Sequence, residues 1–403
     1  MNEIHIQRLD SPGVGEQDIE IVERKGLGHP DSICDAVMER ISQALSQAYI
    51  QRFGKILHHN CDKGLLVAGQ VERQFGGGRM VEPMRLIIGD RATEMVGKER
   101  LKTREIAVEA AKGWFRENLP RLDPGRHLQY QVELRPGSEE LANLFLGSAN
   151  VLGANDTSAA VGYAPLTETE RLVLETERYL NSHIFKSRFP ETGEDVKVMG
   201  VRTKDHLDLT VAMPLLDQYI EGEAKYFRLK DSVEGVLLSY LHSRQERLEK
   251  ITVNLNNLDR PGAGMAGMYL SVLGTSAEDA DSGEVGRGNQ VNGLIALNRP
   301  RGSEAAAGKN PVSHVGKIYN LMTHLLARRL HADVPGLREV TVWLCSRIGQ
   351  PVDQPQMVSA QVVLEKGCAL SDVSVRIRQI VGEEFARMPV FCEELVRGVY
   401  PIC

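Results

Sequence analysis

Short apolar or alternating runs recur along the chain, and turns or longer amphipathic stretches separate them. The runs are rich in strand-forming residues, which favour extended backbone with side chains on two faces. They predict strands at residues 64–71, 84–90, 128–134, 207–213, 251–256, 268–274, 340–346 and 359–366.

The longer stretches carry an apolar residue at every third or fourth position, which is the spacing of one face of a helix. The first of them has apolar side chains at Ile33, Val37, Ile41, Leu45 and Tyr49. The other predicted helices cover residues 103–119, 167–182, 222–249, 312–332 and 370–398.

Hairpin-like strands followed by helices repeat about three times, an order that favours an α+β fold with helices on one face of each sheet. The segments LDPGRH, near residue 125, and DRPGAG, near residue 260, contain the Pro and Gly residues typical of linkers. We therefore expect three domains at residues 1–125, 126–260 and 261–403, with approximate boundaries and with sheets that can exchange strands.

Composition excludes several functional classes. The chain has 403 residues, of which 42% are hydrophobic and 25% charged, as in an ordinary globular protein. Its net charge of −6 argues against a general nucleic-acid or membrane-surface role, so any anionic ligand must meet a local group of cations. The first residues resemble neither a secretory signal nor a transit peptide, and no apolar run approaches the roughly 18 residues of a membrane span, so we expect a cytoplasmic protein.

Six scattered cysteines form no C-x-x-C pair, which predicts free thiols. The adjacent His58 and His59, in HHNCD, raise the question of a zinc site. Neighbouring side chains on a strand point to opposite faces, however, so this pattern is a weak indication of metal binding.

The segment RGSEAAAGKNPVSHVGK, which begins at Arg301, resembles a phosphate-binding loop at first sight. The Walker A spacing fails, because five residues instead of four separate its first two glycines and Asn310 replaces the magnesium-binding hydroxyl after Lys309. Lys309 would nevertheless lie just before a helix N-terminus, where free amide groups favour an anion. The alternative is a helix entry made of small residues with a solvated lysine.

Three further segments combine polar side chains with turn residues. GHPD places His29 and Asp31 at the start of a predicted helix, either as part of a site or as a helix cap. DSGEVGRGN offers Asp281 and Arg287 among glycines that let backbone approach a ligand, or else forms a simple turn. GANDTS, which begins at Gly153, is a loop that is a turn as often as a site.

Together, the motifs GHPDSICD, GANDTSxxVGYAPL, DSGEVGRGN and EAAAGKNPVSHVGKIYN resemble those of the S-adenosylmethionine synthetases, and more narrowly those of the archaeal-type branch. The resemblance runs from about Glu23 to the C-terminus. It implies synthesis of S-adenosylmethionine from ATP and L-methionine, followed by hydrolysis of tripolyphosphate to pyrophosphate and phosphate. It also implies Mg²⁺, with two ions expected, K⁺ as a further cation, and a homodimer with active sites between subunits. Each subunit would have three similar α+β domains, with mixed or antiparallel sheets covered by helices.

The resemblance also implies residue roles. His29 would donate to the triphosphate and Asp31 would bind Mg²⁺, and the same catalytic group would include Lys197, Arg287 and Lys309. The expected ATP-binding residues are Asp156, Asp281, Asn155, Tyr269, Gly137 and Ser138, and the expected methionine-binding residues are Gln70 and Asp281. Structural alternatives remain open for Lys197 as an edge-strand lysine, Tyr269 as a core residue and Ser138 as a helix N-cap.

Several positions depart from the better-known bacterial pattern. Ser32 and Gly288 stand where that branch has lysines, Ser313 and Val315 stand where it has a lysine and a magnesium-binding aspartate, and Gln70 replaces a methionine-binding glutamate. The source of the second magnesium ligand is therefore open, as is the role of His314, which could substitute for the missing lysine or be structural.

Two other functions compete with this interpretation. One is a different ATP-dependent enzyme that transfers phosphoryl or adenylyl groups. The other is a non-catalytic nucleotide-binding subunit of the same family, against which the joint retention of His29, Asp31, Lys197, Arg287 and Lys309 argues.

Overall fold

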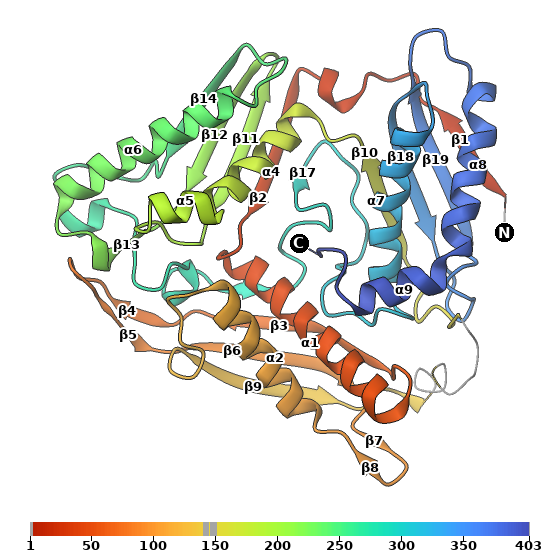
Figure 1. The fold of residues 1–403 in the computed structure, drawn as a ribbon, viewed down its shortest axis with the longest axis horizontal. Helices are drawn as coiled ribbons and strands as arrows, with labels where there is room; N and C mark the ends of the chain where they lie inside the picture. The colour runs from red at the N-terminus through yellow and green to blue at the C-terminus, as the bar shows by residue number, and fades with distance from the viewer. Residues whose placement is uncertain (1–2, 140–144, 146–150, 403) are drawn as a thin grey trace.

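The computed structural model describes residues 3–139, 145 and 151–402. In this part of the chain, three larger sheets surround a central region, and each sheet is covered by helices (Figure 1). The arrangement confirms the α+β class with mixed or antiparallel sheets. In the described residues, no helix combines the length and the apolar character needed to cross a membrane.

The first sheet packs against two helices, α1 (Pro30–Phe53) and α2 (Thr103–Asn118). Its strands, in order across the sheet, are β16 (Gly283–Glu284), β3 (His59–Val67), β6 (Met84–Ala92) and β9 (Leu128–Arg135). The apolar stripe predicted for the first helix is fully buried against this sheet, including Ile33 and Tyr49. Burial of that stripe fixes which face of α1 meets the sheet and leaves its N-terminal turn at the centre of the molecule (Figure 1).

The second sheet is covered by three helices: α4 (Glu168–Leu180), α5 (His183–Arg188) and α6 (Glu223–His242). Its strands, in order, are β14 (Lys250–Leu255), β12 (His206–Ala212), β11 (Lys197–Thr203), β2 (Ile19–Lys25) and β17 (Ile295–Ala296). Strand β2 pairs antiparallel with β11 and runs directly into the loop before α1. The second sheet therefore positions the loop that leads into α1, the helix that covers the first sheet.

The third sheet is covered by α7 (Val315–Asp333) and α8 (Leu370–Ala386), and α9 (Met388–Val396) closes its end. Its strands, in order, are β1 (Ile4–Arg8), β19 (Met357–Leu364), β18 (Leu337–Cys345) and β10 (Ala159–Ala164). The smaller elements are β4 (Gln70–Glu72), β5 (Arg79–Glu82), β7 (Met95–Val96), β8 (Glu99–Arg100), β13 (Leu215–Leu216), β15 (Leu270–Ser271), η1 (Val14–Glu16), η2 (Asp217–Tyr219), η3 (Gly264–Gly267) and η4 (Ser276–Glu278).

Strands from distant parts of the chain share each larger sheet. The third sheet combines β1 from the start of the chain with β10 from its middle, and the first sheet includes β16 from the final third. These exchanges bring loops from all parts of the chain to the centre of the molecule. The division into 1–125, 126–260 and 261–403 stays a prediction.

Two predicted elements were wrong. The strand predicted at 268–274 is reduced to β15, because the carboxylate of Glu278 accepts hydrogen bonds from the amides of Val272 and Leu273 and Gly274 turns the chain with a φ of +85°. The single helix predicted at 370–398 is two helices, α8 and α9, with Pro389 in the first turn of the second.

Candidate active site

The GHPD motif builds the N-terminus of α1. His29 is the N-cap residue, with extended backbone, and its Nδ1 accepts a hydrogen bond from the amide of Asp31 at 3.2 Å. Pro30 follows at the first helical position, where its missing amide hydrogen costs nothing. Because Nδ1 accepts, the ring hydrogen lies on Nε2, which is left to donate to another group. His29 can therefore cap the helix and also donate a hydrogen bond to a ligand.

The glycine-rich loop after Asp281 docks on this same helix end. The amide of Glu284 donates to Oδ1 of Asp31 at 2.9 Å, and the amide of Gly286 donates to Oδ1 of Asp35 at 2.9 Å. A Cβ at Gly288 would lie 2.1 Å from Oδ2 of Asp35, so a side chain there cannot be accommodated without a shift. Two of the motifs singled out from the sequence thus form one surface.

Lys25, at the end of β2, joins the two segments. Its backbone exchanges two hydrogen bonds with the side chain of Asn289, at 2.9 and 2.7 Å. Its Nζ lies 2.9 Å from Oδ2 of Asp31 and donates to the backbone oxygen of Arg287 at 2.6 Å. The sequence analysis did not select this lysine, because EIVERKG looks like an ordinary strand end.

Electrostatics keeps His29 neutral near pH 7. The pKa of His29 is lowered to about 4, chiefly by burial; Asp31 opposes this shift, and the positive charges of Lys25 and Lys197 add to it. Lys197 begins β11, its Nζ lies 3.3 Å from Oε1 of Glu23, and its side chain is 43% exposed. The predicted catalytic residues His29 and Lys197 therefore belong to one group of charged and polar residues at the centre of the molecule.

Asp195 extends this group toward the predicted substrate-binding residues. It accepts hydrogen bonds from the amide and the hydroxyl of Ser276 at 2.7 and 2.5 Å. The pKa of Asp195 is raised to about 6, chiefly by burial, against the hydrogen bonds from Ser276. Asp281 also raises this pKa and Lys197 lowers it, so both residues lie within electrostatic reach. Burial, followed by Asp195, raises the pKa of Tyr269, so this partly buried tyrosine also lies in the neighbourhood.

Three of the predicted site residues, Gln70, Asp281 and Arg287, have exposed side chains. Within the described residues, the side chains of Asp281 and Arg287 form no ion pair or hydrogen bond and are exposed. Gln70 is exposed at the start of β4, two residues after Ala68, whose amide donates to the hydroxyl of Ser282 at 3.0 Å. These side chains are accessible to a ligand.

Lys309, in the loop before α7, belongs to a second cluster that packs against α1. Its backbone oxygen accepts from the hydroxyl of Ser42 at 2.9 Å, and the preceding amide of Gly308 donates to Oε2 of Glu39 at 3.1 Å. Only 2% of its side chain is exposed, and its Nζ pairs with Asp62 and, at 3.1 Å, with Oε2 of Glu304. The solvated-lysine alternative is therefore wrong.

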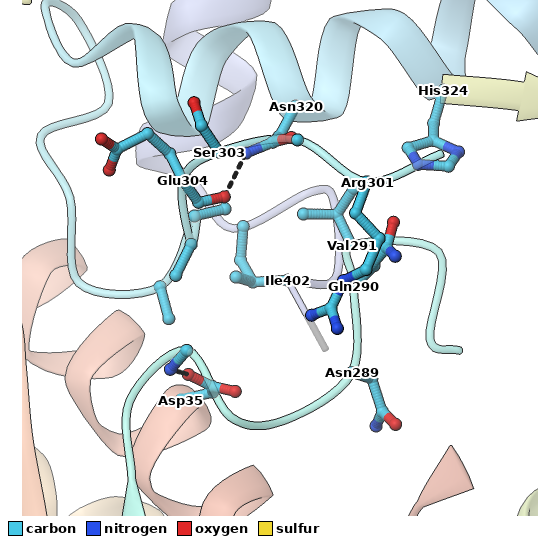
Figure 2. A pocket seen from close by; sticks show the side chains of 15 residues that line it. Asp35, Asn289, Gln290, Val291, Arg301, Ser303, Glu304, Asn320, His324 and Ile402 are labelled. Atoms are coloured by element: carbon cyan, nitrogen blue, oxygen red, sulfur yellow. Dashed lines mark hydrogen bonds between the residues drawn. The ribbon is translucent and has the colours of Figure 1, made fainter. Parts of the chain in front are cut away.

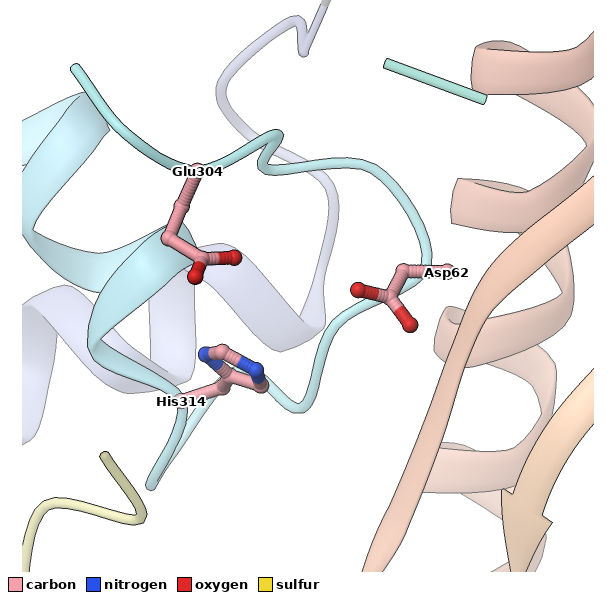
Figure 3. Close-up of side chains that lie close together, drawn as sticks. All are labelled: Asp62, Glu304 and His314. Carbon is pink, nitrogen blue, oxygen red and sulfur yellow. The ribbon is translucent and has the colours of Figure 1, made fainter. Parts of the chain in front are cut away.

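Asp62 and Glu304, the two partners of this lysine, lie close to His314 (Figure 3). Among the described residues, they are the one group of three or more potential metal ligands, and their ligand atoms all lie within 4.8 Å of one another. His314 is the N-cap of α7, its Nδ1 accepts from the amide of Gly316 at 3.1 Å, and burial and then Lys309 lower its pKa to about 3. Burial opposes ionisation of Asp62, but Lys309 and hydrogen bonds with Asp90 and Lys63 together outweigh it and lower the pKa of that carboxyl.

A cavity of about 190 Å³ lies between the two clusters (Figure 2). It is bordered by Asp35 on α1, by the end of the glycine-rich loop and by the segment from Arg301 to Ala307. Asn320, on α7, holds that segment by donating to the backbone oxygen of Glu304 at 2.8 Å. The cavity is therefore bordered by Asp35, one helical turn after Asp31, and by Glu304, which pairs with Lys309.

The remaining predicted residues lie on other loops. The amide of Asn155 donates to the backbone oxygen of Ser313 at 3.2 Å, while Asp156 is exposed. Gly137 packs so closely on His58 that a Cβ there would lie 2.2 Å from its Nδ1. Ser138 follows at the edge of residues 140–144, which lie outside the described part of the chain.

His59 has a structural role. It is fully buried and contacts the hydroxyl of Ser42 at 3.0 Å, the backbone oxygen of Leu57 at 3.0 Å and the amide side chain of Asn310 at 3.1 Å. These bonds hold the Lys309 segment on α1. His58 and His59 are not part of the group of potential metal ligands around Asp62.

Comparison with known proteins decides the family. The model of the S-adenosylmethionine synthetase (AdoMet synthetase) family matches residues 2–399. The chain belongs to the S-adenosylmethionine synthetase family. It is 41% identical over 405 residues to the probable S-adenosylmethionine synthase of Aquifex aeolicus, with 100% of both chains covered. It is 44% identical over 400 residues to the S-adenosylmethionine synthase of the archaeon Aeropyrum pernix, with 98% of both chains covered.

A solved structure titled as an unusual S-adenosylmethionine synthetase from Campylobacter jejuni has the same fold. Its TM-score is 0.56 at 15% sequence identity, over 95% of this chain and 94% of that chain. The resemblance to archaeal-type S-adenosylmethionine synthetases inferred from the four motifs is confirmed by the relatives.

In this S-adenosylmethionine synthetase family member, sequence reasoning missed the carboxylates that surround Lys309. Asp62 lies within HHNCDK, which was considered only as a metal-binding pattern, and Glu304 precedes a run of alanines. A further missed residue is Lys317, on α7, whose Nζ lies 2.6 Å from Oε2 of Glu39 with both side chains buried. The sequence held one sign of this residue, because Lys317 is charged at a position that the helical pattern assigns to the core.

Proposed function

We propose that this chain synthesises S-adenosylmethionine from ATP and L-methionine at the surface formed by α1 and the glycine-rich loop. The methionine sulfur would attack C5′ of ATP in line, the C5′–O5′ bond would break with its electron pair leaving on tripolyphosphate, and water would then convert tripolyphosphate to pyrophosphate and phosphate. The observation that carries the proposal is the docking of Glu284 and Gly286 on Asp31 and Asp35, which brings the GHPD and glycine-rich motifs together.

A neutral thioether needs no general base, so the chemistry rests on positioning and on stabilising the leaving group. The central group suits this task, since Lys25, Lys197 and Arg287 supply positive charges there. In this proposal, Nε2 of neutral His29 donates to the triphosphate, and the charges of Lys197, Arg287 and Lys309 stabilise its oxygens. Lys25, which already contacts Asp31, is added to this group.

The substrate-binding roles are part of the same proposal. Asp281 and Gln70, both exposed beside the central group, would bind methionine. Tyr269 would pack on the adenine ring, and its neighbour Asp195 would position that part of the site. The other proposed ATP-binding residues are Asn155, Asp156, Gly137 and Ser138.

The residues present fit a divalent cation. Asp31 and the pair of Asp62 and Glu304 supply carboxylate oxygens, which are the ligands that Mg²⁺ prefers. We propose that Asp31 holds one Mg²⁺ and that Asp62 and Glu304 hold the second, with Lys25 and Lys309 then free to contact phosphate. Bound Mg²⁺ would neutralise charge on the triphosphate. K⁺ is proposed as an additional activator, and replacing it with tetramethylammonium at constant ionic strength tests that role.

A homodimer completes the proposal. Leu65 and Val67 on β3, and Val201 on β11, are apolar and 36–38% exposed, on the faces of their sheets that the helices do not cover. Exposed apolar faces of this kind favour association with another protein surface. Leu65→Lys should shift the protein toward monomers in analytical ultracentrifugation, while Lys98→Glu, at an exposed site on the β7–β8 hairpin, should not.

Incubation of the purified protein with ATP, L-methionine and Mg²⁺ tests the activity. We expect S-adenosylmethionine with equal amounts of pyrophosphate and phosphate. ADP or AMP as the nucleotide product would favour another ATP-dependent enzyme. ATP binding without any turnover would favour a non-catalytic subunit.

A further inference from the structure

A second pocket, separate from the two clusters on α1, lies between α4 and α7. Its volume is about 400 Å³, which is within the range of small-molecule sites. Arg178 borders it from α4, and His324, Arg328 and His331 border it from α7, while Pro401 closes one side. The pocket therefore joins the helices that cover the second and third sheets.

The charged side chains that line the pocket are all basic. None of its described lining residues is an aspartate or a glutamate. Within the described part of the chain, the exposed side chains of Arg178 and Arg328 make no ion pair and no hydrogen bond. The nearby carboxylate of Glu170 is already held by the guanidinium of Arg299, at 2.9 and 3.1 Å. Nothing among the described residues neutralises the two arginines at the mouth.

His324 supplies a second, independent feature. Its side chain is buried, with 3% of the residue exposed, and its ring packs edge-on against Tyr163 at 5.2 Å. No described residue forms a hydrogen bond with its ring nitrogens, and it lines both this pocket and the cavity of Figure 2. Burial, and then Arg328 and Arg299, lower its pKa to about 3, so the ring is a neutral hydrogen-bond donor near pH 7.

We propose that this pocket binds a small multivalent oxyanion of the phosphate type, apart from the two clusters on α1 and next to the cavity of Figure 2. Two unpaired guanidinium groups supply the planar forks that suit tetrahedral oxyanions, and His324 adds a donor at the buried end. Asn292, whose side chain donates to the hydroxyl of Tyr163 at 2.8 Å, lines the pocket directly after the glycine-rich loop. A bound anion would therefore tie α4, α7 and the end of that loop together.

Isothermal titration with inorganic pyrophosphate, without ATP, methionine or divalent metal, tests the proposal. Because the candidate active site also contains cations, the decisive quantity is the number of sites per chain. We expect the double variant Arg178→Gln/Arg328→Gln to bind one pyrophosphate fewer per chain than the wild type. Arg104→Gln, on the exposed face of α2, removes a similar charge and should bind like the wild type.

Two further measurements separate this site from a general charge effect. His324→Phe keeps the ring against Tyr163 but removes its nitrogens, and it should weaken binding at this site about tenfold or more. Pyrophosphate should also raise the melting temperature less in the double variant than in the wild type, because one stabilising ligand is lost. Repeating the titration with orthophosphate distinguishes the preferred anion.

An equal number of sites and equal affinities in wild type and double variant would overturn the proposal. A loss of affinity shared equally by Arg104→Gln would overturn it as well, since it would show only the effect of net charge. The melting temperatures without ligand establish that each variant is folded.

Discussion

The backbone amide of Glu284 donates a hydrogen bond to Oδ1 of Asp31 over 2.9 Å, although the two residues are 253 positions apart. The bond between Gly286 and Asp35, one helical turn further along α1, repeats the contact. The glycine-rich loop is thus held on the helix by its backbone, and the exposed side chain of Arg287 projects from a fixed position. Disturbing this docking should affect catalysis without removing any proposed ligand.

Gly288→Ala should lower kcat/KM by about 10²-fold or more, the effect of displacing a group that stabilises the leaving group. The reason is steric, because the added Cβ would lie 2.1 Å from Oδ2 of Asp35. Gly113→Ala is the matched control, since no atom lies within 4 Å of its added Cβ on α2. It should leave kcat/KM unchanged and stabilise the protein by about 0.5–1 kcal/mol. Equal kinetics in both variants would show that the docked loop has no catalytic role.

Lys309→Ala should lower kcat by about 10²-fold or more if its charge stabilises the triphosphate. The variant also leaves Asp62 and Glu304 without their shared cation, so urea unfolding should show a loss of stability. Lys63→Ala removes an exposed lysine that contacts the same Asp62 and serves as the control, with a much smaller effect on kcat. Comparable rates in the two variants would sink the catalytic assignment of Lys309.

The ion pair of Glu39 and Lys317 is expected to stabilise the packing of the Lys309 segment against α1. Lys317→Met should destabilise the protein by about 3–5 kcal/mol, because it leaves a buried carboxylate without its partner. Adding Glu39→Gln should cost less than it does in the wild-type background, and a double-mutant cycle by urea unfolding measures this coupling. Purely additive losses would mean that the pair does not act as a unit.

His59 should make stability depend on pH on the acid side. Burial lowers the pKa of His59 to about 3, so between that value and its ordinary 6.5 the unfolded chain binds a proton that the folded chain does not. The free energy of unfolding therefore falls as the pH falls below 6.5, and this histidine contributes about 2 kcal/mol of that loss between pH 7 and pH 5.

The comparison of wild type with His59→Asn isolates this contribution. The destabilisation caused by the substitution should be smaller at pH 5 than at pH 7, as measured by urea unfolding at both values. The same destabilisation at both pH values would show that folding does not lower the pKa of His59.

The local part of the fold could be predicted from the sequence. Turn chemistry and helical periodicity gave α1 and the position of His29 at its N-terminus, because capping depends on neighbouring residues. The strand at 268–274 could not be predicted correctly, because its backbone is diverted by the carboxylate of Glu278, a contact outside the run itself. The same holds for helix 370–398, where Pro389 in a first turn starts a new helix.

In the candidate site, too, local features could be predicted from the sequence and contacts between distant residues could not. Motifs placed Lys309 near an anion site, but the burial of its side chain depends on Asp62 from β3, which is 247 positions away. Lys25 was missed because its contacts to Asp31 and Arg287 arise only when β2 and the glycine-rich loop meet. Spacing along the chain carries no information about such pairs.

The most direct test of the account is to follow the C5′–O5′ bond of ATP. ATP labelled with ¹⁸O at the 5′ bridging oxygen would be incubated with L-methionine, Mg²⁺ and the protein, and the products would be separated and analysed by mass spectrometry. Attack of the methionine sulfur on C5′ predicts that all of the label leaves with the phosphate products and none remains on the adenosyl product. Retention of the label on a nucleoside or nucleotide product would mean that a P–O bond is cleaved instead, and it would contradict the proposed adenosyl transfer.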